Sequence, residues 1–170
     1  MTIPSRILWG SMLAGIAGLV AFMAVLSALR EADDPDQPYV EFAGGGFVFN
    51  YNVAVAYYGF VVRVVRRVPP GTILEAEFED PAGGPPYIVR GVAGVYARQF
   101  RFESPPVKGV KANSDYRVEL RLIDPEDGRL IAAYNHSFRS ELDQDVLPTA
   151  PTTIGPGYRP NPDSSLTAPP

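Results

Sequence analysis

A run of 23 uncharged residues near the N-terminus, Ile7 to Leu29, constrains this chain more than any other feature. At a helical rise of about 1.5 Å per residue the run reaches roughly 35 Å, enough to cross a hydrocarbon core of about 30 Å. A cleaved signal peptide is the alternative, but its apolar region is about 7 to 15 residues long and ends at a small-residue cleavage site. The exit from this run, residues 27–32, lacks a good site. We therefore predict a retained transmembrane helix.

The short leader before this helix, residues 1–6, favours one topology. Arg6 precedes the run and Arg30 follows it, so the positive-inside rule alone does not fix the orientation. The simplest arrangement keeps the leader in the cytoplasm and exports residues 30–170. We therefore predict a single-pass membrane protein whose C-terminal part is extracytoplasmic, which means periplasmic in a Gram-negative cell.

Small residues within the run offer a surface for a second helix. They recur at a spacing of four, as Ser11 with Gly15 and Ala14 with Gly18. This spacing lets two helix backbones approach closely in a membrane. Small residues are also frequent in helices that cross alone, so these four are candidate helix-packing residues and do not by themselves indicate a dimer.

A second uncharged stretch, Phe42 to Val62, competes with the single-span topology. Arg63, Arg66 and Arg67 follow it and would satisfy the positive-inside rule if the chain returned to the cytoplasm. Its composition favours strands, because Val, Tyr and Phe suit a pleated sheet and the glycines at 44–46 are typical of a turn. We expect strands here, with a second span as the alternative.

The region from residue 39 to residue 140 has the pattern of an all-β sandwich or barrel. Short runs of β-branched and aromatic residues alternate there with Gly and Pro clusters. About a hundred residues lie within the usual size of a single-core domain. This assignment leaves an acidic linker at 30–38 and a proline-rich tail at 141–170, which we expect to be disordered. The predicted architecture is one β-sandwich domain behind one transmembrane helix.

Hairpins are expected at three places within this domain. The first joins residues 60–68 to residues 72–80 through a Val-Pro-Pro-Gly turn, and it would place Arg63, Arg66 or Arg67 opposite the glutamates of the second strand. The second joins residues 116–123 to residues 129–139 through an Asp-Pro-Glu-Asp-Gly segment, which favours a type I turn with a bulge. Phe78 to Gly84 repeats this turn chemistry. We expect two hairpins with the same kind of turn, with one duplicated unit as the alternative.

The approach to the strand at 116–123 carries a family resemblance. The segment Val110-Lys111-Ala112-Asn113-Ser114-Asp115-Tyr116 resembles the entry to the penultimate strand of fibronectin type III and related immunoglobulin-like domains, where a tyrosine closes a corner. The resemblance covers about thirty residues. It implies a fold, an immunoglobulin-like sandwich, and no activity.

Composition excludes several function classes. Cysteine is absent, so the chain has no disulfide, thiolate metal site or cysteine nucleophile. Residues 60–139 hold twelve basic and ten acidic side chains, a balance that does not suggest a nucleic-acid partner. The one histidine, His136, shares parity with apolar residues and is expected to be a packed or rim residue. We interpret Asp124, Glu126 and Asp127 as part of a turn and not as calcium ligands, because their spacing is not that of an EF-hand. No catalytic set or cofactor is implied.

Tyrosines supply the candidate contact residues. Tyr57 and Tyr58 are candidates in the domain, and Tyr158 with Arg159 offers an aromatic and a cationic contact between prolines in the tail. The leading hypothesis is therefore a membrane-anchored extracytoplasmic β-sandwich that binds other membrane or envelope proteins as an accessory or assembly component, without catalysis. The alternative is a module for a cell-envelope glycan or small ligand, with exposed Tyr57, Tyr58, Tyr87 or Tyr96 as stacking platforms.

Overall fold

The computed structural model describes residue 16 and residues 18–25 and 37–164 of the 170-residue chain. The chain divides into two compact units, Met1–Gln37 and Pro38–Pro170. In the first unit residue 16 and residues 18–25 are helical, and no helix within the described ranges is both long and apolar enough to cross a membrane. Most of the predicted span, including Ser11, Ala14 and Gly15, lies outside these ranges, so the span stays a prediction.

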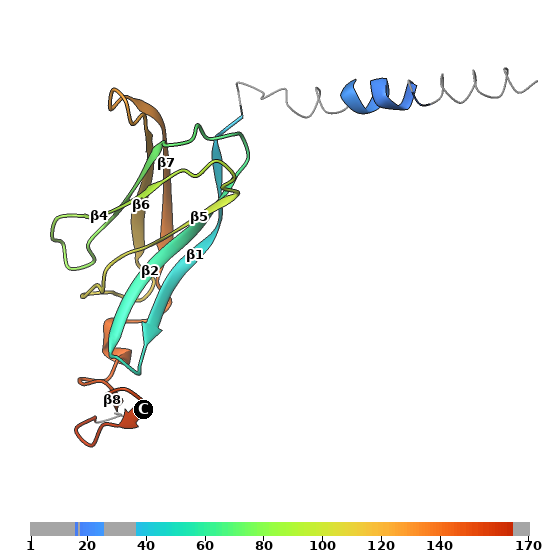
Figure 1. The fold of residues 1–170 in the computed structure, drawn as a ribbon. Helices are drawn as coiled ribbons and strands as arrows, with labels where there is room; N and C mark the ends of the chain where they lie inside the picture. Colours follow the sequence, from blue (N-terminus) through green and yellow to red (C-terminus); the bar gives the residue numbers. More distant parts are fainter. Residues whose placement is uncertain (1–15, 17, 26–36, 165–170) are drawn as a thin grey trace, which may run out of the picture. The chain divides into compact units, whose positions relative to one another are not determined.

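The second unit is an all-β domain of antiparallel strands (Figure 1). A three-stranded sheet has the order β1-β2-β5, and a four-stranded sheet has the order β4-β3-β6-β7. A short 3₁₀ helix, η1, and a two-stranded ribbon, β8-β9, follow them in the chain. The elements are β1 (Val40–Asn50), β2 (Val55–Val64), β3 (Ile73–Phe78), β4 (Tyr87–Val92), β5 (Gln99–Glu103), β6 (Asp115–Ile123), β7 (Leu130–Arg139), η1 (Gln144–Val146), β8 (Thr153–Ile154) and β9 (Arg159–Pro160).

The two large sheets pack face to face around one core. Alternate residues of β2 and of the central strands β3 and β6 are fully buried, as the period of a strand requires. Rings join the layers: Phe60 of β2 lies 5.5 Å from Phe78 of β3, and Tyr58 lies 5.2 Å from the same ring. The predicted all-β sandwich is therefore confirmed.

The expected pairing of residues 60–68 with residues 72–80 is wrong. β2 pairs with β1 and β5, whereas β3 pairs with β4 and β6, so the Val-Pro-Pro-Gly segment carries the chain from one sheet to the other. Buried side chains of β2 and β3 then meet across the core, and a hairpin would have placed the two strands side by side in one sheet. The glutamates of β3 pair instead with Arg90 and Arg121.

The glycines at 44–46 do not form the expected turn. They lie inside β1, which continues to Asn50 after a register shift between Phe42 and Gly44, and the chain reverses at Tyr51–Ala54. An Asn50 side-chain oxygen accepts the Asn52 N–H at 3.1 Å in that turn, and Ala54 has a φ of 53°. Because residues 42–62 form two antiparallel strands, the alternative of a second helical span there is wrong.

The two Asp-Pro hairpins are confirmed. β6 pairs with β7 through Asp124–Gly128, where the Gly128 N–H donates to the Asp124 carbonyl at 3.0 Å and Gly128 has a φ of 71°. The register shifts by a bulge beside this turn. The β3-β4 connection repeats the chemistry, since the Asp80 carboxylate accepts the Ala82 N–H as Asp124 accepts the Glu126 N–H.

A tyrosine hydrogen bond fixes the approach to β6. Tyr116, near the start of β6, is buried, and its hydroxyl oxygen accepts the Lys111 N–H at 2.8 Å. This bond ties the loop before β6 to the strand itself. Its geometry is that of a tyrosine that bonds back to the backbone a few residues upstream.

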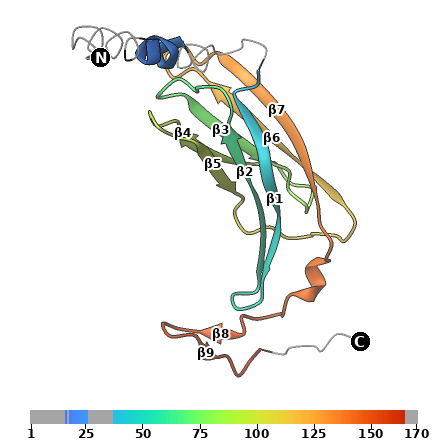
Figure 2. The same ribbon diagram turned by 90° about the vertical axis from the view of Figure 1, so that its right-hand side faces the viewer.

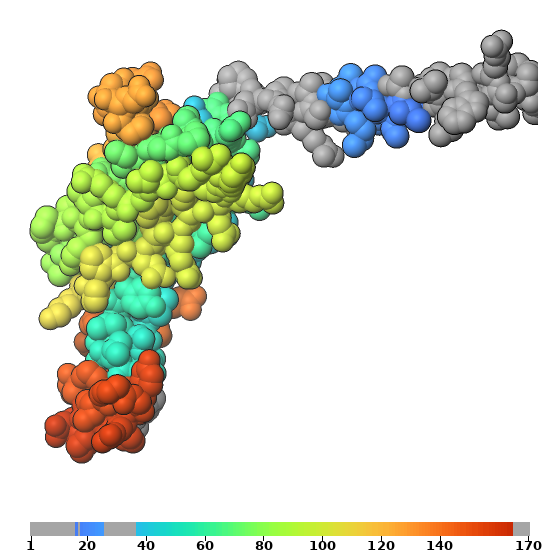
Figure 3. All heavy atoms as spheres, in the orientation of Figure 1, coloured from blue at the N-terminus to red at the C-terminus, as the bar shows by residue number. Residues whose placement is uncertain are grey.

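Residues 141–164 contact the sandwich at two places (Figure 2). The Gln144 N–H of η1 donates to the Val110 carbonyl at 2.8 Å, and Leu147 packs against the core. Farther on, the Thr153 hydroxyl donates to the Asn52 carbonyl at 3.2 Å, which brings this segment to the β1-β2 turn, as the space-filling view also shows (Figure 3). The rest of the predicted disordered tail, residues 165–170, lies outside the described residues.

Candidate binding groove

The outward face of the three-stranded sheet is organised in rows that cross its strands. The register aligns Gly44 with Val61 and Arg101, and Gly46 with Gly59 and Glu103. The next row pairs Val48 of β1 with Tyr57 of β2. Because side chains alternate along a strand, members of these rows point away from the core. The middle row therefore places two glycines and a glutamate between Val61 with Arg101 on one side and Val48 with Tyr57 on the other.

A groove follows from that arrangement. It has a volume of about 350 Å³, and backbone forms its floor where Gly46 and Gly59 lie side by side. Val61 and Arg101 stand on one side, and Val48 and half-buried Tyr57 stand on the other. The surface therefore offers exposed peptide groups at its floor and apolar, aromatic and charged side chains at its walls.

Glycine occupies positions 59 and 44 for different structural reasons. A Cβ on Gly59 would collide with the Phe102 carbonyl and with Glu103, so the packing of β2 against β5 requires glycine there. A Cβ on Gly44 would meet no atom within 4 Å. Glycine weakens a strand by roughly 0.5–1 kcal/mol relative to alanine, and in strands it often marks a close approach by a ligand or another backbone. Gly44 follows the register shift of β1 against β2, which is one ordinary reason for a strand glycine, and it also leaves open space for an approach from outside.

Two opposite charges lie at the end of the groove. Arg101 and Glu103 of β5 form an ion pair of 3.5 Å, and their side chains are 75% and 48% exposed. Such a pair contributes little to stability, about 0–1 kcal/mol. Its groups are therefore free to exchange partners at low cost, and they offer a bound molecule one cationic and one anionic contact.

The tyrosines predicted as contact residues divide between surface and core. Tyr57 lines the groove. Tyr58 is fully buried, so the prediction that it is exposed is wrong. Its hydroxyl donates to the Glu79 carbonyl at 2.6 Å. Burial raises the pKa of that hydroxyl above the ordinary tyrosine range, and the nearby carboxylates of Glu79 and Asp80 raise it further.

The other predicted contact residues do not join the groove lining. Tyr158 is exposed and has a φ of 51°, and Arg159 follows it as the first residue of β9. Tyr87 begins β4 and packs at the border of the core. Tyr96 is 92% exposed in the loop between β4 and β5. The structure therefore brings only Tyr57 of this set into the concave surface.

His136 is a rim residue, as predicted. Its exposed ring stacks on Phe42 of β1 with centroids 4.7 Å apart, and its edge lies against Phe138 at the same distance. These contacts join the free edges of β1 and β7, which are not hydrogen-bonded neighbours. The histidine thus serves the packing of the sandwich edge.

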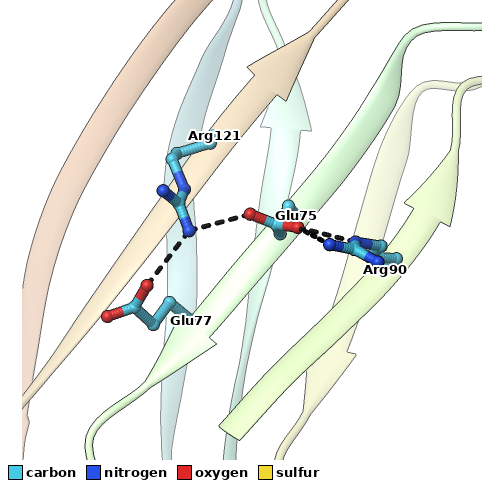
Figure 4. A network of polar contacts seen from close by, with 4 residues as sticks. All are labelled: Glu75, Glu77, Arg90 and Arg121. Atoms are coloured by element: carbon cyan, nitrogen blue, oxygen red, sulfur yellow. Dashed lines mark hydrogen bonds and ion pairs between the residues drawn. The ribbon is translucent and has the colours of Figure 1, made fainter. Parts of the chain in front are cut away.

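The outward face of the four-stranded sheet carries a network of four charged side chains, Glu75, Glu77, Arg90 and Arg121 (Figure 4). Glu75 of β3 accepts a hydrogen bond from Arg90 Nε of β4 at 2.6 Å and lies 2.8 Å from Arg121 of β6, which also contacts Glu77 at 3.1 Å. Beside this network lies an acidic hollow of about 370 Å³, whose lining includes Glu77, Glu79, Asp80, Arg117 and Glu119.

Internal partners account for three of the acids that line this hollow. The Asp80 carboxylate accepts the Ala82 N–H at 3.0 Å. Glu77 contacts Arg121, and Glu79 accepts the Arg117 N–H at 2.9 Å. Within the described part of the chain no group of three or more His, Cys, Asp or Glu side chains is arranged to hold a metal ion. The glycine-floored groove is therefore the better candidate for a binding site.

Sequence reasoning found one member of the groove and missed the rest. Gly44 and Gly46 were interpreted as part of a turn, and Gly59, Arg101 and Glu103 were not singled out, because the position of each in the groove depends on strand register. The available signal was a set of glycines embedded among strand-forming residues, which marks a close approach as well as a turn.

Comparisons with known proteins do not indicate a function for this chain. No protein-family model matches the chain, and neither does any curated protein.

Proposed function

We propose that this protein is a membrane-anchored binding module without catalytic activity, and that its groove holds a segment of another envelope protein. The observation that carries the proposal is the glycine floor formed by Gly46 and Gly59, with Gly44 open beside it. A polypeptide segment fits such a floor, because its own peptide groups and small side chains can approach bare backbone closely. Tyr57 and Val61 would add the apolar contact, and Arg101 with Glu103 the polar one.

The helical residues of the first unit support the membrane anchor. All large apolar side chains among them are exposed by 50% to 63%, namely Ile16, Leu19, Val20, Phe22, Met23 and Val25. At about 100° per residue these positions surround the helix. A helix that is apolar on all sides is stable only inside a protein or a bilayer. Together with the length of the uncharged run, this favours a span over residues 7–29.

The strand pairings support an immunoglobulin-like or fibronectin-type-III-like assignment. Pairs β1-β2, β2-β5, β3-β6 and β6-β7 correspond to A-B, B-E, C-F and F-G of those sandwiches. Tyr116 then occupies the expected place near the start of strand F. The fourth strand, β4, pairs with β3, whereas in the constant-type immunoglobulin sheet the fourth strand joins the A-B-E side. Modules of this architecture host many functions, so the assignment supports a scaffold only.

Site-specific photo-crosslinking in the native membrane tests the proposed function. A photoreactive phenylalanine analogue replaces Val48, which is 44% exposed in the groove wall, and in a matched control it replaces Ile88, which is 52% exposed on the opposite sheet. We expect a protein adduct at Val48 and none at Ile88, with the partner identified by mass spectrometry. Equal adducts at both positions, or none at either, would contradict the groove proposal.

A second candidate function is the binding of a glycan or small ligand of the envelope. Tyr57 favours it, because an aromatic wall beside two charged groups suits the apolar face and hydroxyls of a sugar. Saturation of the purified protein with cell-wall fragments would then protect Tyr57 from iodination. Unchanged iodination, together with a protein adduct at Val48, would decide against this candidate.

The orientation is tested separately. We propose a cytoplasmic leader, residues 1–6, and an extracytoplasmic domain. A reporter fused after Arg139 should be active outside the cytoplasm, and so should one fused after Gly46. Cytoplasmic activity of both fusions would reverse the proposed orientation.

A further inference from the structure

The loop between β4 and β5 exposes an apolar and an aromatic side chain to solvent. Tyr96 at its tip is 92% exposed and Val95 is 57% exposed, and Val92 at the end of β4 is 67% exposed. The loop is closed by the Ala97 N–H, which donates to the Gly94 carbonyl at 3.3 Å. Neither residue of the tip belongs to the core, so their exposure has no explanation within the domain.

This loop lies at the end of the sandwich where the chain enters from the N-terminus. The Val64 N–H donates to the Arg98 carbonyl at 2.9 Å, and the next residue, Val65, donates to the Tyr39 carbonyl at 3.0 Å. Tyr39 directly precedes β1. Figure 2 shows the start of β1 and the β4-β5 connection at this end, and the β1-β2 turn at the other end.

The length of the linker limits how far this end can lie from the bilayer. Nine residues, 30–38, separate the predicted span from Tyr39, and nine residues reach at most about 32 Å in any conformation. The polar headgroup region adds several ångströms beyond the hydrocarbon core. An anchored chain therefore keeps this end of the domain within about 32 Å of the end of the span, so the linker allows this end to reach the membrane surface.

The charges near the loop are compatible with a lipid surface. Arg67 and Arg98 are exposed at this end, and Arg66 lies over the Tyr39 ring with its Cζ 3.6 Å from the ring centroid. Acidic groups also occur nearby, in the β6-β7 turn and in the linker. Asp124 and Asp127 of that turn lie 4.0 Å and 3.7 Å from Arg129. Apolar and aromatic contact, supported by the arginines, would therefore carry the interaction.

We propose that the β4-β5 loop inserts Val95 and Tyr96 into the headgroup region of the bilayer that holds the N-terminal helix. Tyrosine suits that region, because its ring is apolar and its hydroxyl remains hydrated. The contact would hold the domain in one orientation and keep the groove at a set height above the membrane. This inference rests on the proposed anchor, and its test separates the two.

Tryptophan fluorescence in vesicles of brominated phosphatidylcholine with phosphatidylglycerol provides that test on the full chain. Trp9 is the only tryptophan, so quenching of the wild-type protein reports the anchor alone. The loop is read in the Trp9→Phe background with Tyr96→Trp, and the matched control in the same background is Val53→Trp, which sits in the β1-β2 turn and is 44% exposed in the native chain.

We expect the indole of the Tyr96→Trp variant to lose most of its emission when the bromine lies near the headgroups, with a blue shift, and the Val53→Trp variant to be unaffected. Quenching of Trp9 without quenching of the Tyr96→Trp variant would overturn the loop contact and leave the anchor standing. Absence of Trp9 quenching would overturn the anchor, and the loop proposal with it. Equal quenching of both engineered indoles would also overturn it, because it would indicate a domain lying flat on the surface.

Discussion

The Glu75 network offers the sharpest prediction about what stabilises the domain. Glu75 is only 7% exposed although it faces outward, because the arginine side chains of the two neighbouring strands cover it. Its carboxylate lies 2.6 Å from Arg90 and 2.8 Å from Arg121. The perturbation is Glu75→Gln, which keeps the shape and removes the charge.

The expected loss follows from the exposure of each partner. Arg90 is 68% exposed, so its bond contributes about 0.5 kcal/mol after solvent screening, whereas Arg121 is 32% exposed and its bond contributes about 1–2 kcal/mol. A neutral glutamine is less costly to bury than a carboxylate, which offsets part of the loss. The net destabilisation is about 1–2 kcal/mol, or roughly 3–8 °C in Tm for a domain of this size.

Thermal unfolding followed by circular dichroism in detergent measures this loss. The matched control is Glu41→Gln, because Glu41 forms a looser pair with Arg63, at 3.6 Å, and both side chains are more than half exposed. The control should change the free energy of unfolding by less than about 0.5 kcal/mol. If Glu75→Gln were as silent as Glu41→Gln, burial by the two arginines would not carry the stability assigned to it.

Three further predictions concern the core and the turns. Tyr116→Phe removes the acceptor of the Lys111 N–H and should cost about 1–2 kcal/mol in chemical denaturation. Tyr58→Phe removes the hydrogen bond to Glu79 and should cost about 1 kcal/mol at pH 7. The pKa of the Tyr58 hydroxyl is raised in the folded state above its unfolded value of 10.0, so its contribution to the free energy of unfolding is present below pH 10 and is lost as the pH rises further. In strong alkali the Tyr58→Phe variant should therefore lose less stability than the wild type. Equal losses of stability in the two proteins would refute the burial argument. Gly128→Ala should cost about 1 kcal/mol, because φ is 71° there, and an unchanged Tm would contradict the turn geometry.

Local sequence patterns predicted where the strands lie better than they predicted which strands pair. The β6-β7 hairpin followed from strand alternation and an Asp-Pro-Glu-Asp-Gly turn, both of which are local. The β2-β3 connection failed because Pro and Gly signal a reversal without saying which sheet the chain enters next. Register with distant strands decides that question: the partner that contacts Glu75 from β6, Arg121, is 46 residues away.

The candidate site was predictable in part from strand periodicity. Tyr57 and Tyr58 are adjacent, and adjacent strand residues point to opposite faces, so only one of them could face outward. The sequence alone did not say which. The groove itself required the pairing of Gly46 with Gly59. That contact forms between two strands, and a glycine triplet read along one strand resembles a turn.

Filling the groove tests the central claim most directly. Gly44→Val adds a side chain where none of the domain's atoms lies within 4 Å of a Cβ, and its control is Ala133→Val on exposed β7. With the photoreactive residue at Val48, the account predicts that Gly44→Val abolishes the protein adduct while Tm stays equal or rises, and that the control changes neither. An adduct of undiminished yield in a stably folded Gly44→Val variant would contradict the assignment of this groove as the binding site.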